Sequence, residues 1–81
     1  MNKYSADELF KIAYSHLQKK EFEKSTQLFE KLLNDYPNNL SILRNLSLSY
    51  AFSGAFKKAE ECIKKVIKIK LDEPFAYQFL A

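Results

Sequence analysis

A repeat of 34 residues is the feature that most constrains the fold of this chain. When the sequence is shifted by 34 positions, residues of similar size and polarity overlay without a gap. Phe22 then falls on Phe56, and Ser25 falls on Ala59. The other apolar pairs are Leu9 with Leu43, Ile12 with Leu46, Phe29 with Ile63, Leu32 with Val66, and Leu33 with Ile67. A fixed period of this length is typical of proteins built from stacked, similar structural units.

The spacing of apolar residues within each repeat is helical. In the first half of the first repeat, the residues expected to pack against another helix recur at intervals of three and four. The second repeat has the same spacing at residues 43, 46, 47 and 50. These first-half positions are Leu9, Ile12, Ala13 and His16. The second halves, beginning at Phe22 and Phe56, carry a similar pattern. This period indicates amphipathic helices, so the two repeats predict four helices in two hairpins.

Capping residues mark the predicted starts of two of these helices. Ser5 and Glu8 have the spacing of a capping box, in which the two side chains bind each other's backbone N–H groups. Asn39 follows a break at Pro37 and is a favourable N-cap for the third helix.

Two further boundaries rest on glycine and proline. Gly54 stands where a helix must turn sharply, and glycine adopts the left-handed conformation that ends many helices. Its counterpart one repeat earlier is Lys20, which must either adopt that conformation at a cost or use a different turn. Asp72 and Pro74 predict the start of a fifth helix, because proline is tolerated in a first helical turn.

Composition agrees with one small, mostly helical domain. The 81 residues include one Cys, one Gly and two Pro, and 47% are hydrophobic. A disulfide framework, a cysteine-based zinc site and a collagen-like chain are therefore excluded. No apolar run approaches the roughly 18 residues that a membrane span needs, and the first ten residues have no signal-peptide core. A cytoplasmic location is the default expectation.

The net charge of +3 is concentrated in the second half of the chain. It arises from a lysine-rich stretch that also contains Glu60 and Glu61. The lysines are Lys57, Lys58, Lys64, Lys65, Lys68 and Lys70. A solvated helix face explains such a stretch better than nucleic-acid or membrane binding, so we expect neither partner.

The repeat positions resemble the tetratricopeptide repeat, whose period is 34. The match divides the chain into a first repeat at residues 6–39, a second at 40–73, and a partial repeat or C-terminal helix at 74–81. The resemblance implies an all-α fold, in which antiparallel helical hairpins stack into a short right-handed α-solenoid of about five helices. It departs from the family pattern at His16, in place of an aromatic ring, and at Leu71, in place of proline.

A second apolar stripe indicates where a partner binds. The first helix carries apolar residues on a face separate from its core positions, and the third helix carries a matching set. A helix that is apolar on two faces has two surfaces to cover, although packing between neighbouring first helices would use part of the stripe. In the family that the chain resembles, the first helix of each repeat lines a concave groove. We therefore expect the groove to consist of Phe10, Tyr14, Leu17, Arg44, Leu48, Phe52 and Gln78.

The expected function is a non-catalytic interaction module that binds a peptide or an amphipathic helix. Catalysis, a metal and a cofactor are not expected, because His16 stands alone, Asp7 and Glu8 have the positions of a first helical turn, and Glu21 and Glu23 border a turn. One alternative is self-association through an apolar C-terminal end formed by Phe75, Tyr77, Phe79 and Leu80. Another is a recruiting or regulatory N-terminal module of a longer enzyme, since the chain stops within an expected third repeat.

Overall fold

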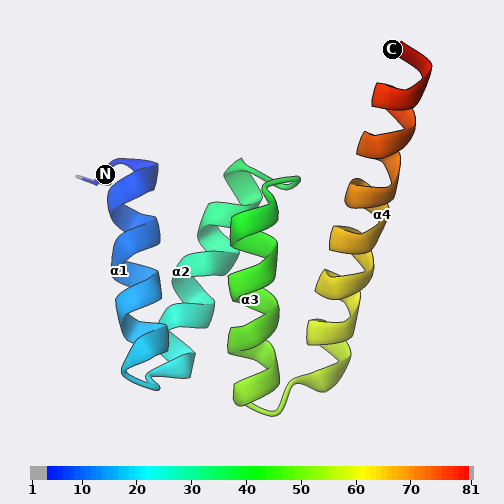
Figure 1. Ribbon diagram of the computed structural model, residues 1–81. Coiled ribbons are helices and arrows are strands. Elements are labelled where there is room, and N and C mark those ends of the chain that lie inside the picture. Colours follow the sequence, from blue (N-terminus) through cyan, green and yellow to red (C-terminus); the bar gives the residue numbers. More distant parts are fainter. Residues whose placement is uncertain (1–3, 81) are drawn as a thin grey trace.

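Four helices follow one another along the chain in a computed structural model that describes the backbone of residues 4–80 and the side chains of residues 4–71. They are α1 (Ala6–Gln18), α2 (Phe22–Asp35), α3 (Leu40–Phe52) and α4 (Phe56–Leu80), with no strand among the residues described. The helices α1 and α3 run in one direction, and α2 and α4 run in the other (Figure 1). The prediction of an all-helical chain is confirmed.

The starts of α1 and α3 are capped by the residues that the sequence predicted. The Ser5 hydroxyl accepts a hydrogen bond of 3.2 Å from the Glu8 backbone N–H, and the Glu8 carboxylate accepts one of 3.1 Å from the Ser5 N–H. Asn39 Oδ1 accepts a bond of 3.0 Å from the Ile42 N–H at the start of α3. These bonds satisfy backbone donors that have no partner within the helix.

The two short helix–helix turns have the same backbone geometry. Gly54 has φ 90° and Lys20 has φ 65°, so both are left-handed. After each helix, two backbone N–H groups bind carbonyls of the last turn: Gly54 binds Ala51 at 3.1 Å, and Ala55 binds Tyr50 at 2.8 Å. Lys20 and Glu21 make the equivalent bonds at the end of α1. The turn type was predicted correctly, and Lys20 adopts the strained form of it.

The core lies where α2 packs between α1 and α3. Phe29 of α2 and Ala13 of α1 are fully buried, and Leu43 and Leu46 of α3 are 1% exposed. The start of α4 adds Ala59 and Cys62 to the same core. Within the described residues α4 contacts α3 and neither α1 nor α2.

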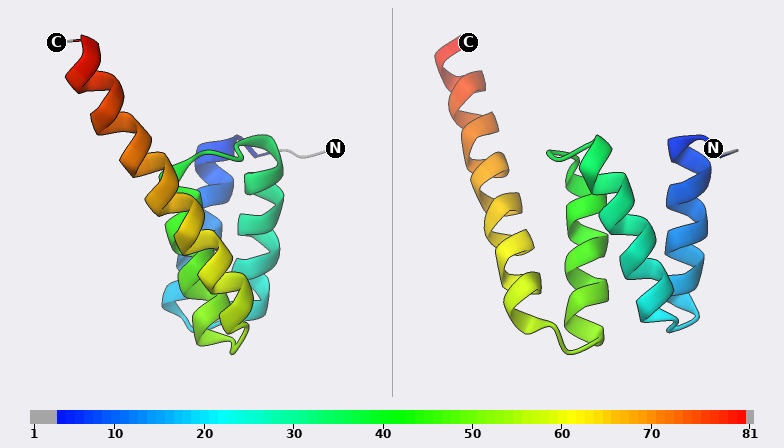
Figure 2. Two further views of the ribbon diagram at one scale, coloured as in Figure 1. Left: turned by 90° about the vertical axis from the view of Figure 1, so that its right-hand side faces the viewer. Right: turned by 180° about the vertical axis from the view of Figure 1, so that it is seen from behind.

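The predicted fifth helix is absent from the described chain, and α4 continues through Asp72 and Pro74 instead. The part of α4 beyond the other helices is visible in Figure 2. Proline in the interior of a helix removes one backbone hydrogen bond and favours a kink, but it need not end the helix.

Candidate functional site

The predicted groove residues include four whose side chains are exposed. Tyr14 of α1 is 43% exposed, and Leu48 and Phe52 of α3 are 46% and 63% exposed. Arg44 is also exposed, one turn before Leu48. Tyr14 and Leu48 have the same position in the 34-residue period, and α1 contacts α3. We call Tyr14, Arg44, Leu48 and Phe52 together the α1–α3 face.

Two other predicted groove residues pack inward. Leu17 is buried, with 8% exposed, and belongs to the core. Phe10 is half-buried, and its ring meets that of Phe29 edge to face with 5.5 Å between centroids. Such a contact adds packing energy between α1 and α2. Both residues therefore stabilise the helix pair and offer little surface to a partner.

The remaining predicted site residues are on the last turns of α4. Gln78 of the groove lies outside the residues whose side chains the structure describes. The same holds for the apolar C-terminal end, which consists of Phe75, Tyr77, Phe79 and Leu80.

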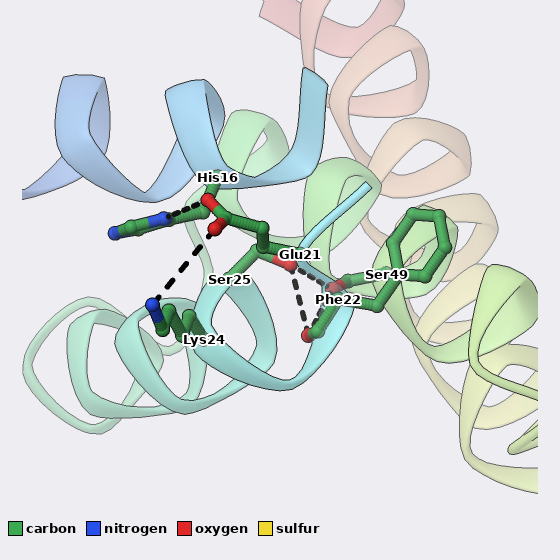
Figure 3. A network of polar contacts seen from close by, with 6 residues as sticks. All are labelled: His16, Glu21, Phe22, Lys24, Ser25 and Ser49. Atoms are coloured by element: carbon green, nitrogen blue, oxygen red, sulfur yellow. Dashed lines mark hydrogen bonds and ion pairs between the residues drawn. The ribbon is translucent and has the colours of Figure 1, made fainter. Parts of the chain in front are cut away.

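A buried hydroxyl network holds the aromatic end of the α1–α3 face in place. Phe52 stacks on Phe22 of α2, with centroids 5.4 Å apart and an angle of 20° between the ring planes. The Phe22 carbonyl accepts hydrogen bonds from the Ser25 hydroxyl at 3.0 Å and from the Ser49 hydroxyl at 3.2 Å (Figure 3). Thr26 Oγ1 lies 2.7 Å from Ser49 Oγ. The network therefore joins α2 to α3 at Phe22, the residue on which Phe52 stacks.

The sequence did not reveal this network. Ser25 stands at a small-residue position of the repeat, so its size explained its presence without its hydroxyl. Ser49 is fully buried, as is Ser25, and a buried hydroxyl needs a hydrogen-bond partner. The signal available in the sequence was a serine on each of two adjacent helices, at positions that helix packing brings together.

The lone histidine forms a polar cluster at the turn between α1 and α2. His16 Nδ1 lies 2.8 Å from Glu21 Oε1, and Lys24 Nζ lies 3.8 Å from Glu21 Oε2 (Figure 3). The hydrogen bond with His16 lowers the pKa of Glu21 from its ordinary value. This cluster ties the end of α1 to the start of α2, consistent with the expected structural role of His16.

An open pocket that the sequence did not predict adjoins the N-terminal ends of α1 and α3. Its volume is about 510 Å³. Phe10 and Ser41 come from the helices of the α1–α3 face, and Leu32 and Tyr36 come from the end of α2. The remaining lining residues are Ser5, Ala6, Asp7, Asn39 and Ile42. Ring, hydroxyl and amide groups meet here, so the pocket suits a side chain that is partly apolar.

Across the part of the chain that the structure describes, His, Cys, Asp and Glu nowhere gather in a group of three or more suited to a metal ion. None of the described helices combines the length and the apolar character that crossing a bilayer requires.

Comparison with known proteins gives one match to a family. Residues 41–73 match the model of the tetratricopeptide repeat, over nearly all of α3 and the first part of α4. These residues coincide closely with the second predicted repeat, 40–73. Comparisons with curated proteins and with solved structures give no match.

Proposed function

Because residues 41–73 carry a tetratricopeptide repeat, which generally mediates protein–protein interactions, we propose that this chain binds a peptide or an amphipathic helix on its α1–α3 face. The proposal extends the repeat to residues 6–39 and treats the two hairpins as the units of a short α-solenoid. Proteins of this repeat class are generally non-catalytic.

The observation that carries the proposal is the pairing of exposed apolar residues on adjacent helices. A single exposed apolar side chain is common, but neighbouring ones form a patch that typically marks an interaction site. Tyr14 and Leu48 are exposed to nearly the same extent at equivalent positions, and Phe52 extends the patch by one turn. Aromatic residues of this kind supply much of the energy at protein interfaces.

The polar and structural surroundings narrow the class of partner. Arg44 stands one turn from Leu48, so a partner with an acidic residue beside its apolar ones would gain a charge-assisted hydrogen bond. The 13 residues of α3 span about 20 Å, which matches three turns of a bound helix or a short extended segment. Phe52 rests on Phe22, so this part of the surface is already ordered before binding.

Peptide selection against the purified chain tests the proposal. A random peptide library displayed on phage is selected on the wild-type chain, and the recovered peptides are titrated by fluorescence anisotropy. We expect sequences that combine apolar residues at helical spacing with an acid, and micromolar affinities. Tyr14→Ala and Leu48→Ala should each weaken binding about fivefold to thirtyfold, the range for truncating an interface residue that contributes 1–2 kcal/mol.

Ile63→Ala is the matched control, because Ile63 is 48% exposed but lies on α4. It should leave the affinity for the selected peptides unchanged. If Tyr14→Ala and Leu48→Ala both retain wild-type affinity, the peptides bind elsewhere and the assignment of the α1–α3 face is wrong.

A further inference from the structure

Helix α4 exposes a continuous apolar stripe that the proposed function does not use. Phe56 is 71% exposed, Ile63 48%, Ile67 52% and Leu71 63%. Their spacing of seven, four and four residues places all four side chains on one side of the helix. The residues that α4 buries against the rest of the chain are Ala59, which borders the stripe one turn before Ile63, and Cys62, which is turned about 100° from Ile63. We call the four exposed residues the α4 stripe.

Two of the four equivalent positions, Phe22 and Phe29 on α2, are covered by other side chains, which shows what the α4 stripe lacks. Phe29 corresponds to Ile63 and is fully buried, and Phe22 corresponds to Phe56 and stacks on Phe52 of α3. Packing between helices of the same chain therefore covers these positions on α2. On α4 the face stays open in the described structure, and four large apolar side chains exceed the scattered exposure that is usual for a surface.

We propose that the α4 stripe pairs with the α4 stripe of a second copy of this chain, with the two helices antiparallel. A two-fold axis at the level of Lys65 places Ile63 of each copy opposite Ile67 of the other at the centre of the contact, with Leu71 beyond them opposite Ala59. The same axis places Glu60 opposite Lys70, and both residues are exposed. Glu60 Oε1 also lies 3.2 Å from Lys64 Nζ of its own helix, so Glu60 would lie between two lysines in the pair. The charges are therefore complementary in the antiparallel arrangement, whereas a parallel pair would oppose Glu60 to Glu60 and Lys70 to Lys70.

End-to-end stacking of copies, with α1 of one chain on α4 of the next, fits the side chains less well. Helix α3 covers α2 with Ser49, which binds the Phe22 carbonyl, and with the ring of Phe52. The equivalent residues of α1 are Ser15 and Gln18. Helix α1 therefore lacks the ring that would stack on Phe56. A closed two-fold pair also avoids the open-ended assembly that repeated stacking would produce.

Sedimentation equilibrium with charge-reversal variants tests the pairing. We expect the wild-type chain to form dimers at a concentration of about 100 µM, with a dissociation constant in the micromolar range. Glu60→Lys and Lys70→Glu should each weaken dimerisation about tenfold, because each creates two like-charge contacts per dimer. The double variant, Glu60→Lys with Lys70→Glu, should restore the wild-type dissociation constant to within about twofold, since the opposite charges again face each other.

Lys65→Glu is the matched control. It makes the same change of charge as Lys70→Glu, but successive residues turn by 100°, so Lys65 points away from the side that carries Ile63 and Ile67. It should leave the dimer unaffected, and circular dichroism establishes that every variant remains helical. A strictly monomeric wild-type chain at 500 µM overturns the proposal. A dimer that the double variant fails to restore overturns the antiparallel register.

Failure here is distinguishable from failure of the proposed function. The α4 stripe shares no residue with the α1–α3 face. Ile63→Lys, which places a charge in the stripe, is expected to make the chain monomeric and to leave peptide binding equal to that of wild type. A monomeric chain that binds peptides on the α1–α3 face would retain the proposed function and remove only the pairing of α4.

Discussion

At the scale of single residues, the hydroxyl network shows how one small buried group can join two helices. Ser25 and Ser49 are both fully buried, and both donate to the Phe22 carbonyl. A hydroxyl at this depth is costly unless it is bonded, and the described buried polar side-chain atoms all have partners. The network therefore favours one relative position of α2 and α3, beyond what apolar packing alone requires.

Ser49→Ala should destabilise the chain by about 1–2 kcal/mol, because the Ser49 hydroxyl is hydrogen-bonded to the hydroxyls of Ser25 and Thr26, and removing it leaves both with fewer partners in a buried site. Urea unfolding followed by circular dichroism measures the change. The double variant Ser25→Ala with Ser49→Ala should cost less than the sum of the two single variants, since removing both groups leaves fewer unsatisfied atoms. Strictly additive costs would mean that the two hydroxyls act independently, contrary to the network.

The His16–Glu21 pair makes a second residue-scale prediction, which concerns pH. The hydrogen bond from His16 lowers the pKa of Glu21 below its ordinary value of 4.5 in the folded chain. A carboxyl with a lowered folded pKa contributes stability above its unfolded pKa, and this stability is lost as the pH falls through the folded pKa. The urea midpoint of the wild-type chain should therefore decrease between pH 5 and pH 3, with Glu21 contributing to the decrease.

His16→Gln isolates the contribution of that pair. Without the imidazole, the pKa of the Glu21 carboxyl should move back toward its ordinary value, as measured by an NMR titration of its side-chain carbon. The stability difference between pH 5 and pH 3 should become smaller at the same time. An unchanged titration of Glu21 in His16→Gln would show that another group lowers its pKa.

At the scale of elements, the two short turns are a natural comparison between glycine and a residue with a side chain. Gly54 and Lys20 have the same left-handed role, and an L-residue is disfavoured in this conformation by about 1–2 kcal/mol. Part of that difference is offset, because glycine has more freedom to lose on folding. Lys20→Gly should therefore stabilise the chain by about 0.5–1 kcal/mol, as measured by thermal unfolding.

Gly54→Ala is the reciprocal change and should destabilise the chain by about 1 kcal/mol. No other atom lies within 4 Å of a Cβ built at Gly54, so the cost comes from the backbone and not from a clash. Equal unfolding temperatures for Lys20→Gly and the wild-type chain would show that the lysine side chain compensates the strain.

The same scale shows which elements the sequence could predict. The starts of α1 and α3 were predictable because Ser5 and Asn39 act locally, on N–H groups three residues away. The end of α4 was not predictable, because a proline can end a helix or only kink it, and the surrounding residues decide which of the two occurs. The sequence predicted that Tyr14 and Leu17 belong to a second apolar face of α1. It did not predict that Tyr14 is exposed and Leu17 is buried. The depth of each side chain depends on how closely α2 and α3 approach, which periodicity does not contain.

At the scale of the whole molecule, the helices form a series in which each packs mainly on its neighbours. Helix α2 is held from both sides by α1 and α3, whereas the described part of α4 contacts α3 alone. In such a linear arrangement, the free energy of opening an end unit is smaller than that of unfolding the whole chain. The hairpin of α3 and α4 is therefore expected to open at α4 first, while α1, α2 and α3 stay packed around Phe29.

Cys62 reports on this opening, because it is on α4 and only 8% exposed. Burial raises the pKa of its thiol, which slows its reaction with a disulfide reagent further while α4 is docked. Labelling of Cys62 under native conditions should give a free energy of opening about 1–3 kcal/mol below the free energy of global unfolding in urea. Ala59→Gly, at the same contact of α4 with α3, should speed labelling while amides in α1 keep their hydrogen-exchange protection. Equal free energies for labelling and global unfolding would contradict the stepwise model, since α4 would then leave α3 only when the whole series of helices unfolds.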